Sequence, residues 1–121
     1  MNNVYSISSG TLTCYSSYVL YDFAGKFYGL KEAKEMVKII DTHYRGRTCV
    51  VISDRKMQAN VDPRTYLEVH SKCVIGIAIV STNKDVKKDA FKEQEIYEGF
   101  FTYFETLDQA ISWVSTIVKP T

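Results

Sequence analysis

A polar loop over residues 53–64 holds most of the side chains in this chain that could do chemistry. It begins with Ser53 and Asp54, which put a hydroxyl beside a carboxylate, as nucleophilic catalysis requires. No Gly-x-Ser-x-Gly elbow exposes this hydroxyl, so a turn-forming polar pair explains the two residues better. Asp54 and Asp62 flank the same loop as paired carboxylates, but Asp62 is accounted for as the cap of a following helix.

Three cations, Arg55, Lys56 and Arg64, belong to the same loop. Arginine is well suited to bidentate contact, so the loop could receive a phosphate or an acidic partner surface. A solvated polar edge is the simpler interpretation and the one we favour, because surface charge is common. The candidate partner-binding surface consists of Asp54, Arg55, Asp62, Pro63 and Arg64.

Metal, cofactor and nucleotide chemistry have little support in the sequence. His70 and Cys73 have the i, i+3 spacing of metal ligands, but the chain has only two histidines and no Cys-x-x-Cys pair. No Gly-x-Gly-x-x-Gly follows a strand and no P-loop pattern occurs, so nucleotide phosphates have no obvious binding loop. We expect no catalytic residues, no metal and no cofactor.

The loop must be positioned by the elements on either side of it. Residues 49–52 are Cys, Val, Val and Ile, a run without polar alternation that is typical of a strand buried on both faces of a parallel sheet. The loop therefore leaves from the carboxyl end of a strand, where open α/β sheets tend to bind ligands. Asp62 and Pro63 then predict a helix start, with the Asp62 side chain accepting from free amides of the first turn.

The remaining elements follow from hydrophobic periodicity and turn signals. Residues 81–99 mix charges of both signs, and we expect a loosely amphipathic helix there, capped by Asn83 or Asp85, with a solvated charged face. Thr106 and Gln109 form a capping-box pattern at the start of the last helix, which Pro120 ends. Strands are predicted at 4–8, 11–23 with a bend at Ser16 and Ser17, 74–80 and, at a sheet edge, 100–104, and helices at 30–44 and 63–71.

Length and composition describe an ordinary soluble domain. The 121 residues, of which 45% are hydrophobic and 24% charged, predict one domain over residues 1–121. The net charge of +1 provides no field that would attract nucleic acid or an anionic membrane. No secretory signal or membrane-spanning run is present, and Cys14, Cys49 and Cys73 fit buried free thiols, so we expect a cytoplasmic location.

Several segments together resemble the STAS family, the anti-sigma-factor antagonist fold, and more closely its small stand-alone SpoIIAA-like bacterial proteins. They are VVISDRKMQANVDPR, the later strand VIGIAIVS and the terminal FETLDQAISW, in which Phe104, Thr106, Ala110 and Trp113 make the most distinctive pattern. The resemblance covers nearly the whole chain. It implies an α/β fold, with a SpoIIAA-like sheet of about five or six mixed strands and about four helices packed around it.

The resemblance also implies a non-enzymatic role in binding a protein partner or, in related domains, a small or lipid-like ligand. In signalling STAS domains the helix-opening loop reads approximately Asp-Ser-Ser-Gly, and a serine there is phosphorylated by a partner kinase. Asp62 matches the aspartate, but Pro63, Arg64 and Thr65 occupy the next places, so the phosphorylatable serine is absent.

The sequence thus favours a regulatory binding domain that acts by protein–protein interaction without the usual phosphoserine. The alternative is a protein that binds a small apolar ligand or lipid in a pocket opened between the first and third helices. A homodimer is a further possibility, through an exposed strand near either chain end or through residues 100–104.

Overall fold

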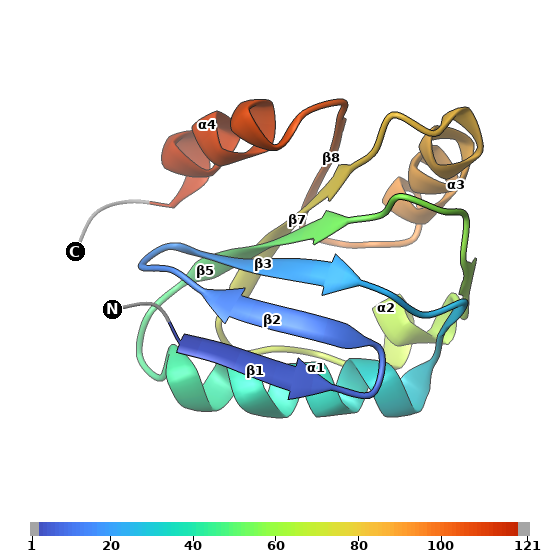
Figure 1. Ribbon diagram of the computed structural model, residues 1–121. Helices are drawn as coiled ribbons and strands as arrows, with labels where there is room; N and C mark the ends of the chain where they lie inside the picture. Colours follow the sequence, from blue (N-terminus) through green and yellow to red (C-terminus); the bar gives the residue numbers. More distant parts are fainter. Residues whose placement is uncertain (1–2, 119–121) are drawn as a thin grey trace.

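The computed structural model describes residues 3–118, which form a mixed six-stranded sheet with four helices around it (Figure 1). This confirms the predicted α/β architecture. The sheet has the strand order β1-β2-β3-β5-β7-β8. The elements are β1 (Asn3–Ile7), β2 (Gly10–Cys14), β3 (Tyr18–Phe23), β4 (Phe27–Tyr28), α1 (Leu30–His43), β5 (Cys49–Asp54), β6 (Asn60–Val61), α2 (Arg64–Glu68), β7 (Val74–Val80), α3 (Lys84–Gln94), β8 (Phe100–Phe104) and α4 (Leu107–Ile117).

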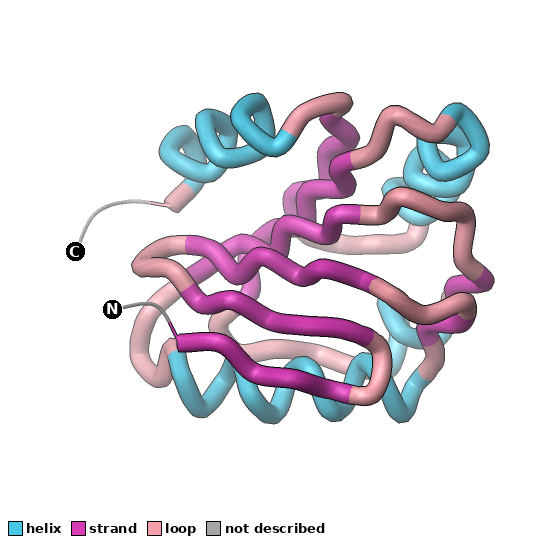
Figure 2. Tube along the Cα trace, in the orientation of Figure 1, coloured by secondary structure: helices cyan, strands magenta, loops and turns pink. Residues whose placement is uncertain are grey.

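Strands β3, β5, β7 and β8 run parallel, whereas β1 and β2 are antiparallel to their neighbours. The carboxyl ends of β3, β5, β7 and β8 therefore lie at one edge of the sheet, and the loop after β5 leaves from that edge as predicted. Figure 2 shows β4 and β6 beyond that edge, in the connections that follow β3 and β5, where they pair in parallel with each other. Strand β8 lies at an edge, as predicted.

The single long strand expected over 11–23 is wrong, because the chain reverses direction within it. Strand β2 ends at Cys14, and β3 starts at Tyr18 and runs antiparallel to β2. The Tyr15 amide donates to the Tyr18 carbonyl at 2.9 Å, and the two rings stack at 4.6 Å. The short polar residues Ser16 and Ser17 form the tip of a turn instead of a bend, since such side chains favour turns.

Two layers of helices cover the sheet, and α1 and α4 lie on opposite sides of it (Figure 1). Val51 packs in one cluster with Met36 and Ile40 of α1, whereas Val50 and Ile52 pack with α4. Neighbouring residues in a strand face opposite sides, so β5 is buried on both faces as predicted. Helix α3 packs on the α1 side, through Val86 and Ala90 against Ile79 of β7 and Phe101 of β8.

The predicted helix signals are confirmed at α3 and α4. Thr106 and Gln109 form a reciprocal capping box, and the Asn83 side chain accepts from the Asp85 amide at 2.9 Å. Gly76 lets α4 approach β7, because a Cβ there would lie 3.0 Å from Cδ1 of Ile117. Pro120, expected to end α4, is outside the described residues.

Helix α2 is shorter than the predicted 63–71. It ends at Glu68, after which Val69 is extended. Leu67 is 58% exposed, while Thr65 is buried. A helix of five residues has only one side toward the sheet, and Thr65 and Tyr66 occupy that side.

Candidate functional site

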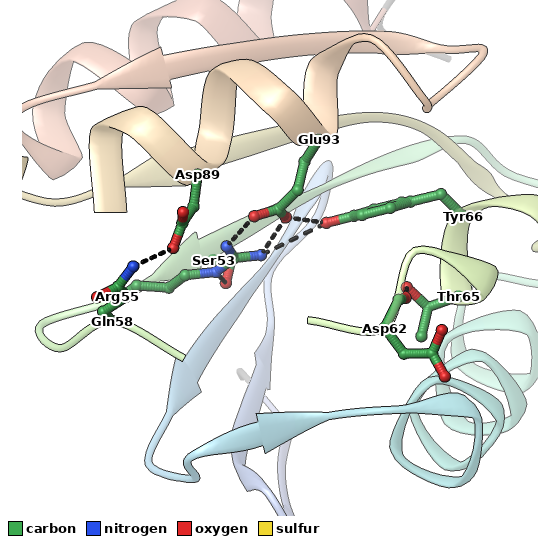
Figure 3. Close-up of polar contacts among 8 residues, drawn as sticks. All are labelled: Ser53, Arg55, Gln58, Asp62, Thr65, Tyr66, Asp89 and Glu93. Carbon is green, nitrogen blue, oxygen red and sulfur yellow. Dashed lines mark hydrogen bonds and ion pairs between the residues drawn. The ribbon is translucent and has the colours of Figure 1, made fainter. Parts of the chain in front are cut away.

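Arg55 follows β5 directly, and its side chain turns into the protein. Its amide donates to the carbonyl of Val80, which extends the β5–β7 pairing by one bond of 2.9 Å. Its guanidinium forms a bidentate ion pair with Glu93 of α3, with Nη1–Oε2 at 2.8 Å and Nη2–Oε1 at 2.9 Å (Figure 3). Only 7% of Arg55 and 6% of Glu93 are exposed, so the two charges neutralise each other inside the protein.

Tyr66 of α2 completes this group, which we call the Arg55 cluster: Arg55, Tyr66 and Glu93. The Tyr66 hydroxyl donates to Oε1 of Glu93, and Nη2 of Arg55 lies 3.4 Å from the same hydroxyl (Figure 3). Burial by itself would lower the pKa of Arg55, but the interactions with Glu93 and Tyr66 together outweigh burial, so the pKa of Arg55 is raised. Burial also raises the pKa of Tyr66, so its phenol stays neutral. The cluster ties β5, α2 and α3 together.

The expectation that Arg55 offers its charge at a binding surface is corrected by this burial. Asp54 and Arg55 point to opposite faces because they are neighbours in an extended chain, and α3 supplies a carboxylate on the Arg55 side. Asp54 is partly exposed, and its pKa is raised by burial and by the nearby Asp22, while Lys56 opposes the shift.

Glu93 was missed because it belongs to the charged run that the sequence predicts to be solvated. A signal for it exists, since Val86, Ala90 and Glu93 follow one another at spacings of four and three. That spacing puts the carboxylate on the buried stripe of α3, and all three residues are buried. A carboxylate in such a stripe requires a buried cation or donor, which Arg55 supplies.

Asp62, Pro63 and Arg64 lie together at the start of α2. Oδ1 of Asp62 accepts from the Arg64 amide at 3.0 Å, as predicted for a carboxylate before the first turn. The Arg64 side chain returns to the same carboxylate, with Nη2–Oδ2 at 2.6 Å, and this ion pair lowers the pKa of Asp62. Thr65 is the nearest hydroxyl, but it is buried and donates to the Asp62 carbonyl at 2.8 Å (Figure 3 shows both residues).

The other polar candidates are placed apart from one another. The Ser53 hydroxyl is buried and contacts Nε of Arg55 at 3.4 Å, and a guanidinium cannot accept its proton. Cys73 is buried and its thiol donates a hydrogen bond to the Tyr44 carbonyl, whereas His70 is exposed. Over residues 3–118, no three His, Cys, Asp or Glu side chains lie close enough together to hold a metal ion.

No helix among these described residues is long and apolar enough to cross a bilayer.

An apolar cleft of about 400 Å³ opens on the α1 side of the sheet, between α1, α2, β7 and the segment before β8. Aliphatic and aromatic side chains form most of its walls. Val37 and Val69 are partly exposed, while Ala33, Met36 and Ile40 are buried. The lining residues are Tyr28, Ala33, Met36, Val37, Ile40, Val51, Thr65, Tyr66, Val69, His70, Ser71, Val74, Ile75, Ile77, Tyr97, Glu98 and Gly99.

A smaller space of about 30 Å³, the inner chamber, adjoins the apolar cleft. It is bounded by Ser53 and Arg55 in addition to aromatic side chains, so it brings the cleft next to the Arg55 cluster. Neither space was recognisable in the sequence, because both arise from the way α1 and α2 pack over the sheet. The walls common to both spaces are Tyr28, Met36, Val51, Tyr66 and Ile77.

Comparison with known proteins supports the fold. No protein-family description matches the sequence, and no curated protein matches it either. A crystal structure of an uncharacterized protein of the DUF3478 family from Shewanella loihica PV-4, described as having a SpoIIAA-like fold, superposes with a TM-score of 0.61 at 14% identity. The match covers 94% of this chain and 92% of that one. The chain therefore has a SpoIIAA-like fold, as its resemblance to that group predicts.

Proposed function

We propose that the protein is a non-enzymatic binding domain whose apolar cleft takes a small apolar or lipid-like molecule. The observation that supports this best is the cleft itself. Its volume of about 400 Å³ is in the range of small-molecule sites, which are mostly apolar with a few polar groups.

A role without catalysis is supported by the state of the polar groups near the cleft. Arg55 and Glu93 neutralise each other, and the Ser53 hydroxyl contacts a cation instead of a base. Three free cysteines are buried, which favours the cytoplasm as the place of action, because reduced thiols persist there.

Filling the cleft is expected to weaken binding of a neutral apolar dye such as N-phenylnaphthylamine. Val37 lines the cleft from α1, so Val37→Trp puts an indole into the space and lowers dye affinity by at least about tenfold, since each 1.4 kcal/mol of lost contact is tenfold. Fluorescence titration measures the affinity. Lys38→Trp is the matched control, because Lys38 is exposed on the same helix and outside the cleft. Equal dye binding by both variants would contradict the proposal.

A second candidate function is regulation of a protein partner through the surface around the start of α2. Asp62, Pro63 and Arg64 lie at this surface, with 60% of the Arg64 side chain exposed. Leu67 of α2, three residues after Arg64, is 58% exposed. Exposed apolar side chains beside an arginine are common features of protein interfaces. The SpoIIAA-like fold supports such a regulatory role.

Reversing the charge of Arg64 is the test of this second function. Arg64→Glu replaces the Asp62 ion pair with a repulsion and is expected to weaken partner binding by about tenfold or more. The measurement is quantitative affinity capture with wild-type and variant baits, followed by binding assays on the captured protein. Arg45→Glu is the control, because Arg45 is exposed in the α1–β5 connection, away from α2. Equal retention by wild type and both variants would rule out this surface.

A further inference from the structure

Three of the polar side chains that line the apolar cleft, Thr65, Tyr66 and Ser71, already have partners inside the protein. The Thr65 hydroxyl donates to the Asp62 carbonyl, and the Tyr66 hydroxyl donates to Glu93. The Ser71 hydroxyl donates to Asp41 and accepts from two backbone amides. A ligand gains little from groups whose hydrogen bonds are already made, because it would have to replace those bonds.

Tyr28, at the inner end of the cleft, differs from these three residues. It lines both the apolar cleft and the inner chamber, and its hydroxyl has no hydrogen-bond partner among residues 3–118. Its ring is held by Tyr21 and Phe23, with centroids 6.0 Å and 6.2 Å away, and its carbonyl accepts from the Asp62 amide at 2.9 Å. The phenol is therefore positioned by its neighbours, with one donor and its acceptor sites free.

The charges near Tyr28 favour an uncharged ligand group. Arg55 borders the inner chamber, but both of its terminal nitrogens are bonded to Glu93. An anionic head group there would have to compete with a buried carboxylate, and it would lose its hydration without gaining a free cation. Burial raises the pKa of Tyr28, so its phenol remains a neutral donor at physiological pH.

Resting on the proposed function, we infer that the ligand of the apolar cleft carries an uncharged hydroxyl or carbonyl group that bonds to Tyr28. The ligand class is a medium-chain alcohol or a similar neutral lipid, and a fatty acid or other anionic lipid is disfavoured. Since a water occupies about 30 Å³ in the liquid, and a methylene group is of similar size, 400 Å³ accommodates about a dozen such groups. Decanol is a probe of suitable length.

The test is competition of decanol, decanoic acid and decane against bound N-phenylnaphthylamine at pH 8. Wild-type protein is expected to bind decanol at least about tenfold more tightly than ionised decanoic acid. The carboxylate of the acid would lose its hydration in the cleft without gaining a cation as partner. Tyr28→Phe is expected to lower the affinity for decanol by about fivefold, the typical value of one hydrogen bond, and to leave the affinity for decane unchanged. A thermal melt checks that the variant is folded.

Tyr97→Phe is the matched control. Tyr97 also lines the apolar cleft and lacks a partner for its hydroxyl among the described residues, but it is not part of the inner chamber. Its removal is expected to leave decanol affinity unchanged. If decanoic acid competes as well as decanol, or if folded Tyr28→Phe keeps wild-type decanol affinity while still binding the dye, the head-group inference is overturned and the proposed function stands. Failure of the wild type to bind the dye and all three probes would overturn both.

Discussion

Glu93→Ala is expected to lower the free energy of unfolding by about 3–5 kcal/mol, because it leaves the buried Arg55 guanidinium without its counter-charge. Arg55 is 7% exposed, so its guanidinium has little access to water in the folded protein. The Tyr66 hydroxyl loses its acceptor in the same variant, which adds to the cost. Urea denaturation followed by far-ultraviolet circular dichroism measures the change.

Two further variants separate charge from packing. Asp89 lies one helical turn before Glu93, and its side chain accepts only an exposed hydrogen bond from Gln58 at 2.9 Å. Asp89→Ala should therefore lower the free energy of unfolding by less than about 1 kcal/mol. The triple variant Arg55→Met, Tyr66→Phe and Glu93→Leu removes both charges together with the hydroxyl that bonds to them, and it keeps apolar volume. It should be at least as stable as the wild type, since replacement of a buried pair by apolar residues is often neutral or stabilising. A Glu93→Ala effect as small as that of Asp89→Ala would contradict the buried-charge argument.

The Arg55 cluster also bears on binding, because Tyr66 is a wall of both the apolar cleft and the inner chamber. Glu93 fixes the Tyr66 hydroxyl from α3, so the shape of the cleft on the α2 side depends on a residue that does not line it. The same contacts keep the deep end of the cleft electrically neutral. The cluster thus contributes both to stability and to the kind of ligand that the site can accept.

Much of the fold could be predicted because its signals are local. The apolar runs of β5 and β7 require burial on two faces, and the Thr106–Gln109 pair gives the start of α4. The error at β2 and β3 has a local cause as well. Both strands carry apolar residues on each parity, so periodicity could not locate the reversal that Ser16 and Ser17 produce.

The candidate site could be predicted only in part, because its features depend on tertiary packing. Asp62, Pro63 and Arg64 are neighbours in sequence, and they stay together at the start of α2. Arg55 and Glu93 are 38 residues apart, and nothing local to either one indicates that they meet. The apolar cleft has no sequence pattern at all, since its walls come from α1, α2, β7 and the segment before β8.

Gly10→Ala is expected to destabilise the protein by about 3 kcal/mol or more, since the backbone at this position excludes a side chain. Gly10 has φ +152°, and a Cβ there would lie 2.1 Å from the Asp22 carbonyl oxygen, inside the β2–β3 ladder. The strands would have to separate to admit it. Gly46→Ala is the matched control: its φ of +78° also disfavours a side chain, but no atom lies within 4 Å of the added carbon, so its cost should be about 1 kcal/mol. Urea denaturation of the two variants measures the difference, and equal losses would show that the contact with Asp22 is relieved by a small shift.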